Sequence, residues 1–176
     1  GETLKNTTSL VAQWNFNEAS GTTADNNEGT TTRDLTLTGF DSTASQDADP
    51  DSTWTANNRR WGAGALQFDG TDSYAYCTDA NCGGTSALDY PGSGGWTISA
   101  WVKHVNTGTS DMVIAKHAAS GNYGYYLGID STNLVTFFTS SNGTATDSLN
   151  SITSLPDADW HYIVATYDGT NKYIYL

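Results

Sequence analysis

The feature that most constrains the fold is a repeated two-residue alternation of apolar and polar side chains. In Trp96–Lys103 (W-T-I-S-A-W-V-K) the even positions are apolar, and Thr, Ser, Trp and Lys occupy the odd ones. Successive side chains of a strand point to opposite faces, so this pattern predicts a strand with one buried face. Leu10–Phe16 alternates in the same way. No window repeats apolar residues at about 3.6 positions, so we expect no helix longer than a turn or two.

Further strand patterns and turn dipeptides extend this prediction along the chain. Asn-Gly at Asn142-Gly143 and Asp-Gly at Asp69-Gly70 and Asp168-Gly169 are typical hairpin turns. Six Trp, ten Tyr and five Phe supply large core side chains. We therefore expect an all-β antiparallel sandwich of the jelly-roll type. The additional expected strands are Leu66–Phe68, Tyr74–Tyr76, Met112–Lys116, Tyr123–Ile129, Leu134–Thr139, Trp160–Tyr167 and Tyr173–Leu176.

The charge of the chain excludes several classes of partner. Seven Lys and Arg stand against 19 Asp and Glu, a formal net charge of −12 at pH 7. A nucleic-acid binder needs a basic surface, and an anionic membrane repels such a chain, so we expect neither partner. The apolar runs are far shorter than the roughly 20 residues of a membrane span, which excludes membrane insertion. The length of 176 residues predicts one domain, 1–176, with an N-terminal extension at 1–9 and a long acidic loop at 41–60.

The cysteines and the N-terminus bear on the compartment. Cys77 and Cys82 predict either a disulfide that closes a short loop or two free thiols in a reducing cytosol. Asn6 and Asn142 each begin an N-x-Ser/Thr sequon, which is compatible with glycosylation in a secreted or cell-surface protein. The chain opens at Gly1 without Met, which predicts a removed leader or a piece of a longer protein.

Four motifs in order resemble one family. L-V-A-Q-W-N-F-N-E from Leu10 is followed by S-G-T-T-A-D, and G-A-L-Q-F-D-G-T-D-S-Y begins at Gly64. W-T-I-S-A-W-V-K begins at Trp96, and W-H-Y-I-V-A-T-Y-D-G begins at Trp160. Together these resemble the laminin-G-like, concanavalin A-like jelly rolls of lectins and glucanases. The resemblance implies a β-sandwich and a binding or adhesion function.

The chain departs from the family pattern at its end. Members of the family continue beyond this point with a turn and several further strands, whereas this sequence stops at Leu176. An uncapped sandwich edge favours aggregation. We therefore expect a jelly roll that is incomplete at its C-terminus, either as a fragment or as a subunit completed by a neighbouring chain.

Catalytic patterns are weak in this sequence. Glucanases of this architecture usually carry E-x-D-x-x-E on one strand, whereas Glu occurs here only at positions 2, 18 and 28. There are three His and no G-x-S-x-G nucleophile motif. We therefore expect no catalytic residues and no enzymatic activity.

Calcium is implied by the resemblance, because the family often holds Ca²⁺ near the opening loop or the F-D-G-x-D turn. The matching residues are Asp25 and Asn27 in the first segment and Asp69 and Asp72 in the second. Calcium prefers oxygen ligands of this kind. The alternative is ordinary turn chemistry, in which Asp and Asn accept hydrogen bonds from their own backbone.

Carbohydrate recognition is the other expected chemistry, since sugars stack on aromatic rings beside polar groups. Trp54, Trp61, Tyr90 and Tyr126 lie in polar stretches or at outward positions and are the candidate ligand-binding residues. For the two tryptophans the alternative is that they anchor the acidic loop to the sandwich. A further three tryptophans alternate inward and are expected in the core: Trp14, Trp96 and Trp160.

Two functions from different classes follow. The first is a non-catalytic extracellular module that binds a glycan or a surface protein, as part of a larger secreted or surface protein. The second is a structural subunit of a filament, capsid decoration or tail fibre, with the missing strands supplied by a neighbouring chain.

Overall fold

A computed structural model describes residues 9–27, 33–40, 53–82, 88–89, 94–117, 123–144 and 146–176. The chain divides into two compact units, Gly1–Leu88 and Asp89–Leu176. Within the described residues there is no α-helix, and every strand pairing is antiparallel. The all-β, antiparallel prediction is confirmed, whereas the expected single domain stays a prediction. Asn6, Tyr90 and most of the acidic loop lie outside the described residues.

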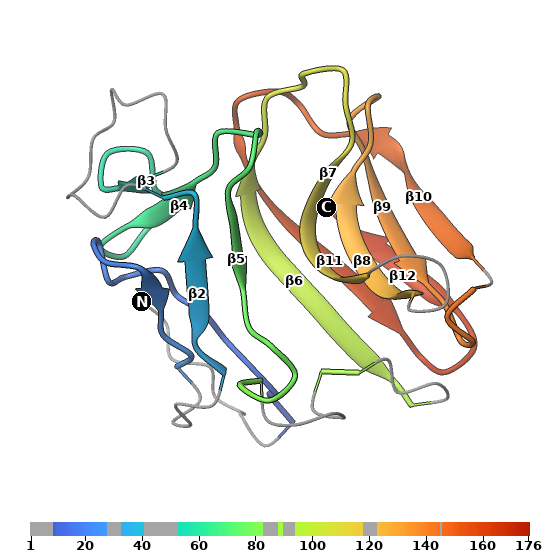
Figure 1. The fold of residues 1–176 in the computed structure, drawn as a ribbon. Helices are drawn as coiled ribbons and strands as arrows, with labels where there is room; N and C mark the ends of the chain where they lie inside the picture. The colour runs from blue at the N-terminus through green and yellow to red at the C-terminus, as the bar shows by residue number, and fades with distance from the viewer. Residues whose placement is uncertain are drawn as a thin grey trace. The chain divides into compact units, whose positions relative to one another are not determined.

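The first unit contains two small sheets (Figure 1). A three-stranded sheet has the order β1-β2-β5, with β1 at Thr23–Ala24, β2 at Leu35–Thr38 and β5 at Tyr74–Tyr76. A two-stranded sheet pairs β3 (Thr53–Thr55) with β4 (Ala65–Gln67). Strands of both sheets supply the core of this unit, which buries Ala24, Leu37 and Trp54.

The second unit is built from two larger sheets. One has the order β10-β9-β8-β7, with β7 at Asp111–His117, β8 at Tyr123–Ile129, β9 at Leu134–Thr139 and β10 at Asp147–Ser154. The other has the order β12-β11-β6, with β6 at Trp96–Lys103, β11 at Trp160–Tyr167 and β12 at Lys172–Tyr175. Both sheets contribute to a single core, so they form a two-layered sandwich (Figure 1). Its buried residues are Leu127, Ile129, Val135, Phe137, Leu155, Ile163 and Ala165.

The alternation predicted for β6 is confirmed. Its apolar even positions, Trp96 to Val102, pack against the core. On the opposite face Trp101 stacks on Tyr162 of β11, with ring centroids 5.2 Å apart. The hairpins expected at Asn142-Gly143 and Asp168-Gly169 are also confirmed, because β9 pairs with β10 and β11 with β12.

The opening segment differs from its prediction. Leu10–Phe16 is no strand, and its one ladder contact is an isolated bridge between Trp14 and Asn26. Phe16 has a φ of 53°, in the left-handed region that an extended strand cannot continue through. Its side chain nevertheless packs against the core of the first unit.

The pairing around Asp69-Gly70 was also predicted wrongly. The turn exists, but β4 pairs with β3 and β5 pairs with β2, so the strands on either side of the turn do not form a hairpin. Four strands were missed: β1, β2, β3 and β10. They are short or rich in Ser, Thr, Asn and Asp, and pairing with a neighbouring strand, more than apolar alternation, defines them.

Candidate functional site

The four aromatic residues predicted to bind a ligand fall into different environments. Trp54 is wrong as a ligand platform, because its side chain is fully buried and its Nε1–H donates to the Gly21 carbonyl at 2.9 Å. Trp61 is 56 % exposed at the end of the β3–β4 hairpin. Tyr126 lies on β8 in the second unit. Tyr90 lies outside the described residues.

Tyr126 lines a shallow pocket with a volume of about 90 Å³. On β8 and β9, Tyr126 and Thr136 occupy the face opposite to the core residues Leu127 and Val135, as strand alternation requires. The pocket therefore opens on the outer face of the four-stranded sheet. It is lined by Ser110, Asp111, Met112, Tyr126, Ile129, Asp130 and Thr136.

The ring of Tyr126 is held rigidly at this pocket. Its neighbour across the strand pair is Phe138, and the two rings stack with centroids 5.0 Å apart and an interplanar angle of 9°. A Cβ placed on Gly128 would lie 3.4 Å from the Tyr126 ring and 2.6 Å from the carbonyl oxygen of Asp111. The glycine therefore leaves the space that the ring and the β7 backbone occupy.

The carboxylate of Asp111, another residue of the pocket lining, contacts a histidine. His104 Nε2 lies 2.8 Å from Asp111 Oδ2, and the His104 side chain is only 11 % exposed. Asp111 pairs with the core residue Ile129 in the β7–β8 register, so its carboxylate lies on the inner face of the sheet, toward His104 at the end of β6.

The second carboxylate, Asp130, closes the turn between β8 and β9. Its Oδ1 accepts hydrogen bonds from the Thr132 hydroxyl (2.7 Å), the Thr132 N–H (2.8 Å) and the Leu134 N–H (3.0 Å). The Thr132 hydroxyl, followed by the two backbone N–H groups, lowers the pKa of Asp130 below its usual range. Asp130 is therefore an anion at neutral pH.

A second carboxylate network supports the loops at this end of the unit. Asp157 Oδ1 accepts hydrogen bonds from the Asn106 N–H at 3.1 Å and the Asn133 side-chain amide at 2.9 Å. The Asn106 side-chain amide in turn donates to the Ser131 carbonyl at 3.2 Å. These contacts connect three loops around the β8–β9 turn, which restricts its motion.

The predicted calcium residues form two separate pairs of exposed or loop side chains. Asn27 Oδ1 accepts the Asn15 N–H at 3.0 Å, and Asp69 Oδ1 accepts the Thr71 N–H at 3.0 Å and the Ser73 hydroxyl at 2.8 Å. Calcium needs roughly six to eight oxygens. The described residues contain no group of three or more His, Cys, Asp or Glu arranged to hold a metal. Asp25, Asn27, Asp69 and Asp72 do not by themselves fit a calcium site, and calcium stays a prediction.

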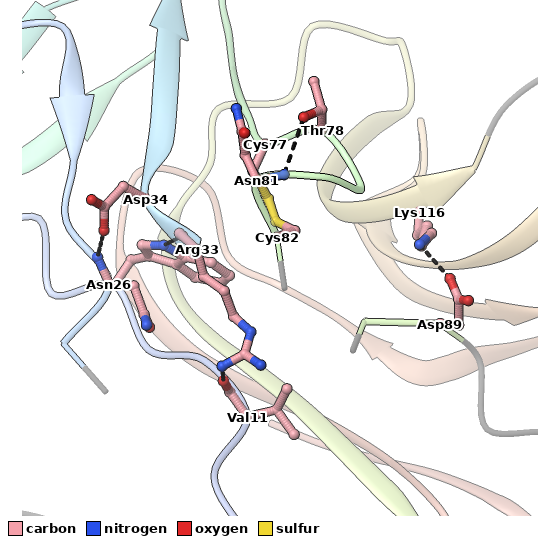
Figure 2. Close-up of a disulfide and its surroundings, with 11 residues drawn as sticks. Val11, Asn26, Arg33, Asp34, Cys77, Thr78, Asn81, Cys82, Asp89 and Lys116 are labelled. Atoms are coloured by element: carbon pink, nitrogen blue, oxygen red, sulfur yellow. Dashed lines mark hydrogen bonds and ion pairs between the residues drawn. A yellow bond between two sulfur atoms is a disulfide. The ribbon is translucent and has the colours of Figure 1, made fainter. Parts of the chain in front are cut away.

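Figure 2 shows the disulfide that was predicted between Cys77 and Cys82. Their Cα atoms are 5.6 Å apart. The enclosed residues form a turn in which the N–H groups of Asn81 and Cys82 donate to the Thr78 carbonyl at 2.9 and 2.8 Å. The bridge is confirmed, and it closes a tight loop directly after β5.

The second sequon also lies in a turn. Asn142 is exposed between β9 and β10, and its Oδ1 accepts the Thr144 N–H at 3.0 Å. Glycosylation at this residue stays a prediction. Among the described residues, no helix combines the length and apolar character of a membrane span.

Sequence reasoning did not single out the polar residues of the pocket. Asp111 and Asp130 each stand at an end of a strand, and only the pairing of β7 with β8 brings them to one pocket. A usable signal was the D-S-T-N run at Asp130, which is typical of a side-chain-capped turn between two strands.

Comparison with known proteins gives a family but no close relative. A family model of the concanavalin A-like lectin/glucanases superfamily matches residues 68–176, which comprises the whole second unit and the end of the first. Among curated proteins and solved structures, no significant match was found. The matched range includes β5 and all strands from β6 to β12, together with the pocket and the disulfide. The chain belongs to the concanavalin A-like lectin/glucanase superfamily.

Proposed function

We propose that this chain is a non-catalytic carbohydrate-binding module of a secreted or surface protein, and that the Tyr126 pocket contacts the sugar. The supporting observation is a rigid aromatic ring in a concave site whose lining also includes Asp130, Asp111 and Thr136. Sugars bind through stacking of their apolar C–H face on such a ring and through hydrogen bonds to fixed acceptors. The disulfide and the family membership support an extracellular location.

The charge of the pocket selects among sugars. Asp130 is an anion among the lining residues, and its negative charge repels uronic acids and sulfated sugars and favours hydroxyl or ammonium groups. The pocket holds about 90 Å³, well below the roughly 300–1,000 Å³ of drug-sized sites. We therefore expect neutral or amino sugars, bound one residue at a time and weakly, with Kd values of about 0.1–1 mM.

The protonation state of Asp130 supports a binding role over hydrolysis. A glycosidase needs one carboxylic acid whose pKa is raised so that it can protonate the leaving group. Hydrogen bonds lower the pKa of Asp130 instead. In Asp111 one oxygen already contacts His104. We expect no hydrolysis of aryl glycosides, and turnover that disappears in an Asp130→Asn variant would contradict this assignment.

Calorimetric titration with neutral and amino oligosaccharides tests the proposal. Tyr126→Ala should weaken binding about two- to tenfold, because a stacked ring contributes roughly 0.5–1.5 kcal/mol. The matched control is Tyr162→Ala, which removes an exposed tyrosine that is also stacked on an aromatic partner, on the other sheet of the same unit. The control should bind as the wild type does. Equal loss in both variants, or no binding of any neutral or amino sugar, would refute the proposal.

The same titration tests calcium. A loss of sugar binding in EDTA that added Ca²⁺ restores would support the calcium prediction, whereas unchanged binding would mean that the pocket acts without the metal. The alternative function, a structural subunit completed by a neighbouring chain, stays a prediction that ordered multimers in electron micrographs would support.

A further inference from the structure

Three polar side chains on adjacent strands lie together on the outer face of the four-stranded sheet. β8, β9 and β10 are neighbours in this sheet (Figure 1). Thr136 of β9 pairs with Asn150 of β10, and the Asn150 side-chain amide lies 3.5 Å from Oδ2 of Asp130, which directly follows β8. Asp130 and Thr136 line the same pocket as Tyr126. A carboxylate, a hydroxyl and an amide therefore meet at one side of this pocket.

The Thr136 side chain lacks a polar partner in the described part of the chain. The residue is only 7 % exposed, and no hydrogen bond of its hydroxyl occurs among the described residues. Polar side chains that are buried to this extent are normally hydrogen-bonded, because an unmade hydrogen bond costs free energy. Since Thr136 lines the pocket, a ligand bound there supplies the missing partner.

One oxygen of Asp130 remains for a ligand. Its Oδ1 already accepts hydrogen bonds from the Thr132 hydroxyl and from the N–H groups of Thr132 and Leu134. Its Oδ2 has only the Asn150 amide, at the distance limit of a hydrogen bond. Asp130 is an anion at neutral pH, and no ion pair neutralises it among the described residues. Oδ2 is therefore a charged acceptor on the outer face, next to Thr136 and Asn150.

Negative charge dominates this end of the second unit. Hydrogen bonds connect three segments here, which the structure describes completely: 103–112, 128–136 and 150–161. They contain four Asp, two His and one Lys. The lysine, Lys103, belongs to β6 in the other sheet. Charges interact over a Debye length of about 8 Å at physiological salt, so a cationic group is favoured at the pocket.

We infer that this side of the pocket binds a primary ammonium group, and that its ligand is an amino sugar with a free amine, such as glucosamine. An ammonium group has three N–H donors, which match the Asp130 carboxylate, the Thr136 hydroxyl and the amide oxygen of Asn150. A sugar hydroxyl or an N-acetylated amine offers only one donor and no charge. The inference rests on the proposed function of the same pocket and names the class of sugar.

A sugar fits this site better than the other common carrier of a primary ammonium group, a lysine side chain. The amine of glucosamine is attached directly to a rigid ring, so little conformational entropy is lost on binding. A lysine carries its ammonium on a flexible four-carbon stem that binding must order. Tyr126 in the same pocket supplies the aromatic contact for the apolar face of the sugar ring.

Calorimetric titration with a matched set of trisaccharides tests the inference. Trimers of glucosamine, N-acetylglucosamine and glucose with the same linkage differ only in the group at C2 of each ring. The glucosamine trimer should bind about three- to tenfold more tightly than the other two, because charge-assisted hydrogen bonds are roughly twice as strong as neutral ones. This preference should shrink in high salt, which screens charge, and disappear at a pH at which the amine has lost its proton.

Variants of the three polar residues assign the preference to the pocket. Asp130→Asn should bind the glucosamine and glucose trimers equally. Thr136→Val and Asn150→Ala should each weaken binding of the glucosamine trimer about two- to fivefold, and both leave the Asp130 turn intact if the first variant does not fold. The matched control is Asp159→Asn, which removes the same charge from an exposed residue outside the pocket lining. It should keep the wild-type preference.

The outcomes separate this inference from the proposed function. Binding of no trimer would overturn both. Equal binding of all three trimers would overturn the inference and leave the proposed function standing, and so would an unchanged preference in Asp130→Asn or the same loss in Asp159→Asn. Wild-type binding of the glucosamine trimer by both Thr136→Val and Asn150→Ala would also overturn it. Trilysine that binds as tightly as the glucosamine trimer would overturn the assignment to a sugar. Variants are compared only at an unchanged melting temperature.

Discussion

Replacement of Trp54 by alanine is the sharpest test of the division between core and surface tryptophans. Trp54 of β3 is completely buried in the core of the first unit, and its indole N–H donates to the Gly21 carbonyl. Trp61, seven residues later in the same hairpin, is 56 % exposed. The two residues share a residue type, a hairpin and a unit, and differ in burial.

The expected cost follows from this burial. Truncation of a buried tryptophan to alanine costs about 3–5 kcal/mol, since it removes apolar contacts and leaves a cavity. The half-buried Gly21 carbonyl also loses its donor, an effect of about 1–3 kcal/mol that overlaps with the first. A unit of the size of Gly1–Leu88 has a free energy of unfolding of about 4–13 kcal/mol. Trp54→Ala should therefore remove much of the stability of the first unit.

Urea unfolding followed by far-ultraviolet circular dichroism measures this effect without relying on the fluorescence of the replaced residue. Trp54→Phe should lie between alanine and wild type, because it keeps a ring in the core but removes the donor. Trp61→Ala should lower the free energy of unfolding by less than about 1 kcal/mol, the value of an exposed cation–π contact such as the one that Trp61 makes with Arg60. The reasoning fails if Trp54→Ala unfolds within 1 kcal/mol of the wild type, or if Trp61→Ala costs as much as Trp54→Ala.

Three further outcomes are expected. Gly128→Ala should destabilise the second unit by about 1–3 kcal/mol and weaken sugar binding, because the new methyl group meets the Asp111 carbonyl. Calorimetry and sugar titration would measure the two effects, and a variant with unchanged stability and binding would contradict the close approach. Serine at both Cys77 and Cys82 should cost at most about 2 kcal/mol, since the bridge closes only a short loop, and chemical denaturation measures it. Because hydrogen bonds lower the folded-state pKa of Asp130, its stabilising contribution is present above its unfolded pKa of about 3.9 and disappears as the pH falls below that value. Asp130→Asn should therefore flatten the decline of melting temperature in acid, and parallel curves for both proteins would oppose this cause.

Much of the fold could be predicted where six to eight consecutive residues alternate or are rich in aromatic and β-branched side chains. β6, β8, β9 and β11 were placed correctly, and the Asn-Gly and Asp-Gly turns located two hairpins. β10 was missed because Asp147–Ser154 is mostly polar and becomes a strand through its hydrogen bonds to β9.

The site could be predicted only in part, for a related reason. Tyr126 was recognised as an outward aromatic residue, but Asp111 is separated from it in sequence and reaches the pocket through the β7–β8 pairing. His104, which orients Asp111, gave no sequence signal, since its role depends on one contact of 2.8 Å.

The sequence alone therefore decided the fold class, the acidic character and the faces of β6, because these depend on residue type and local spacing. Tertiary structure decided which strands pair and which aromatic rings are buried. Trp54 and Trp61 belong to the same hairpin, but Trp54 is buried and Trp61 is exposed. Alternation assigns a side chain to one face of a strand, but only the packing of other segments against that face determines whether the side chain is covered or remains available to a ligand.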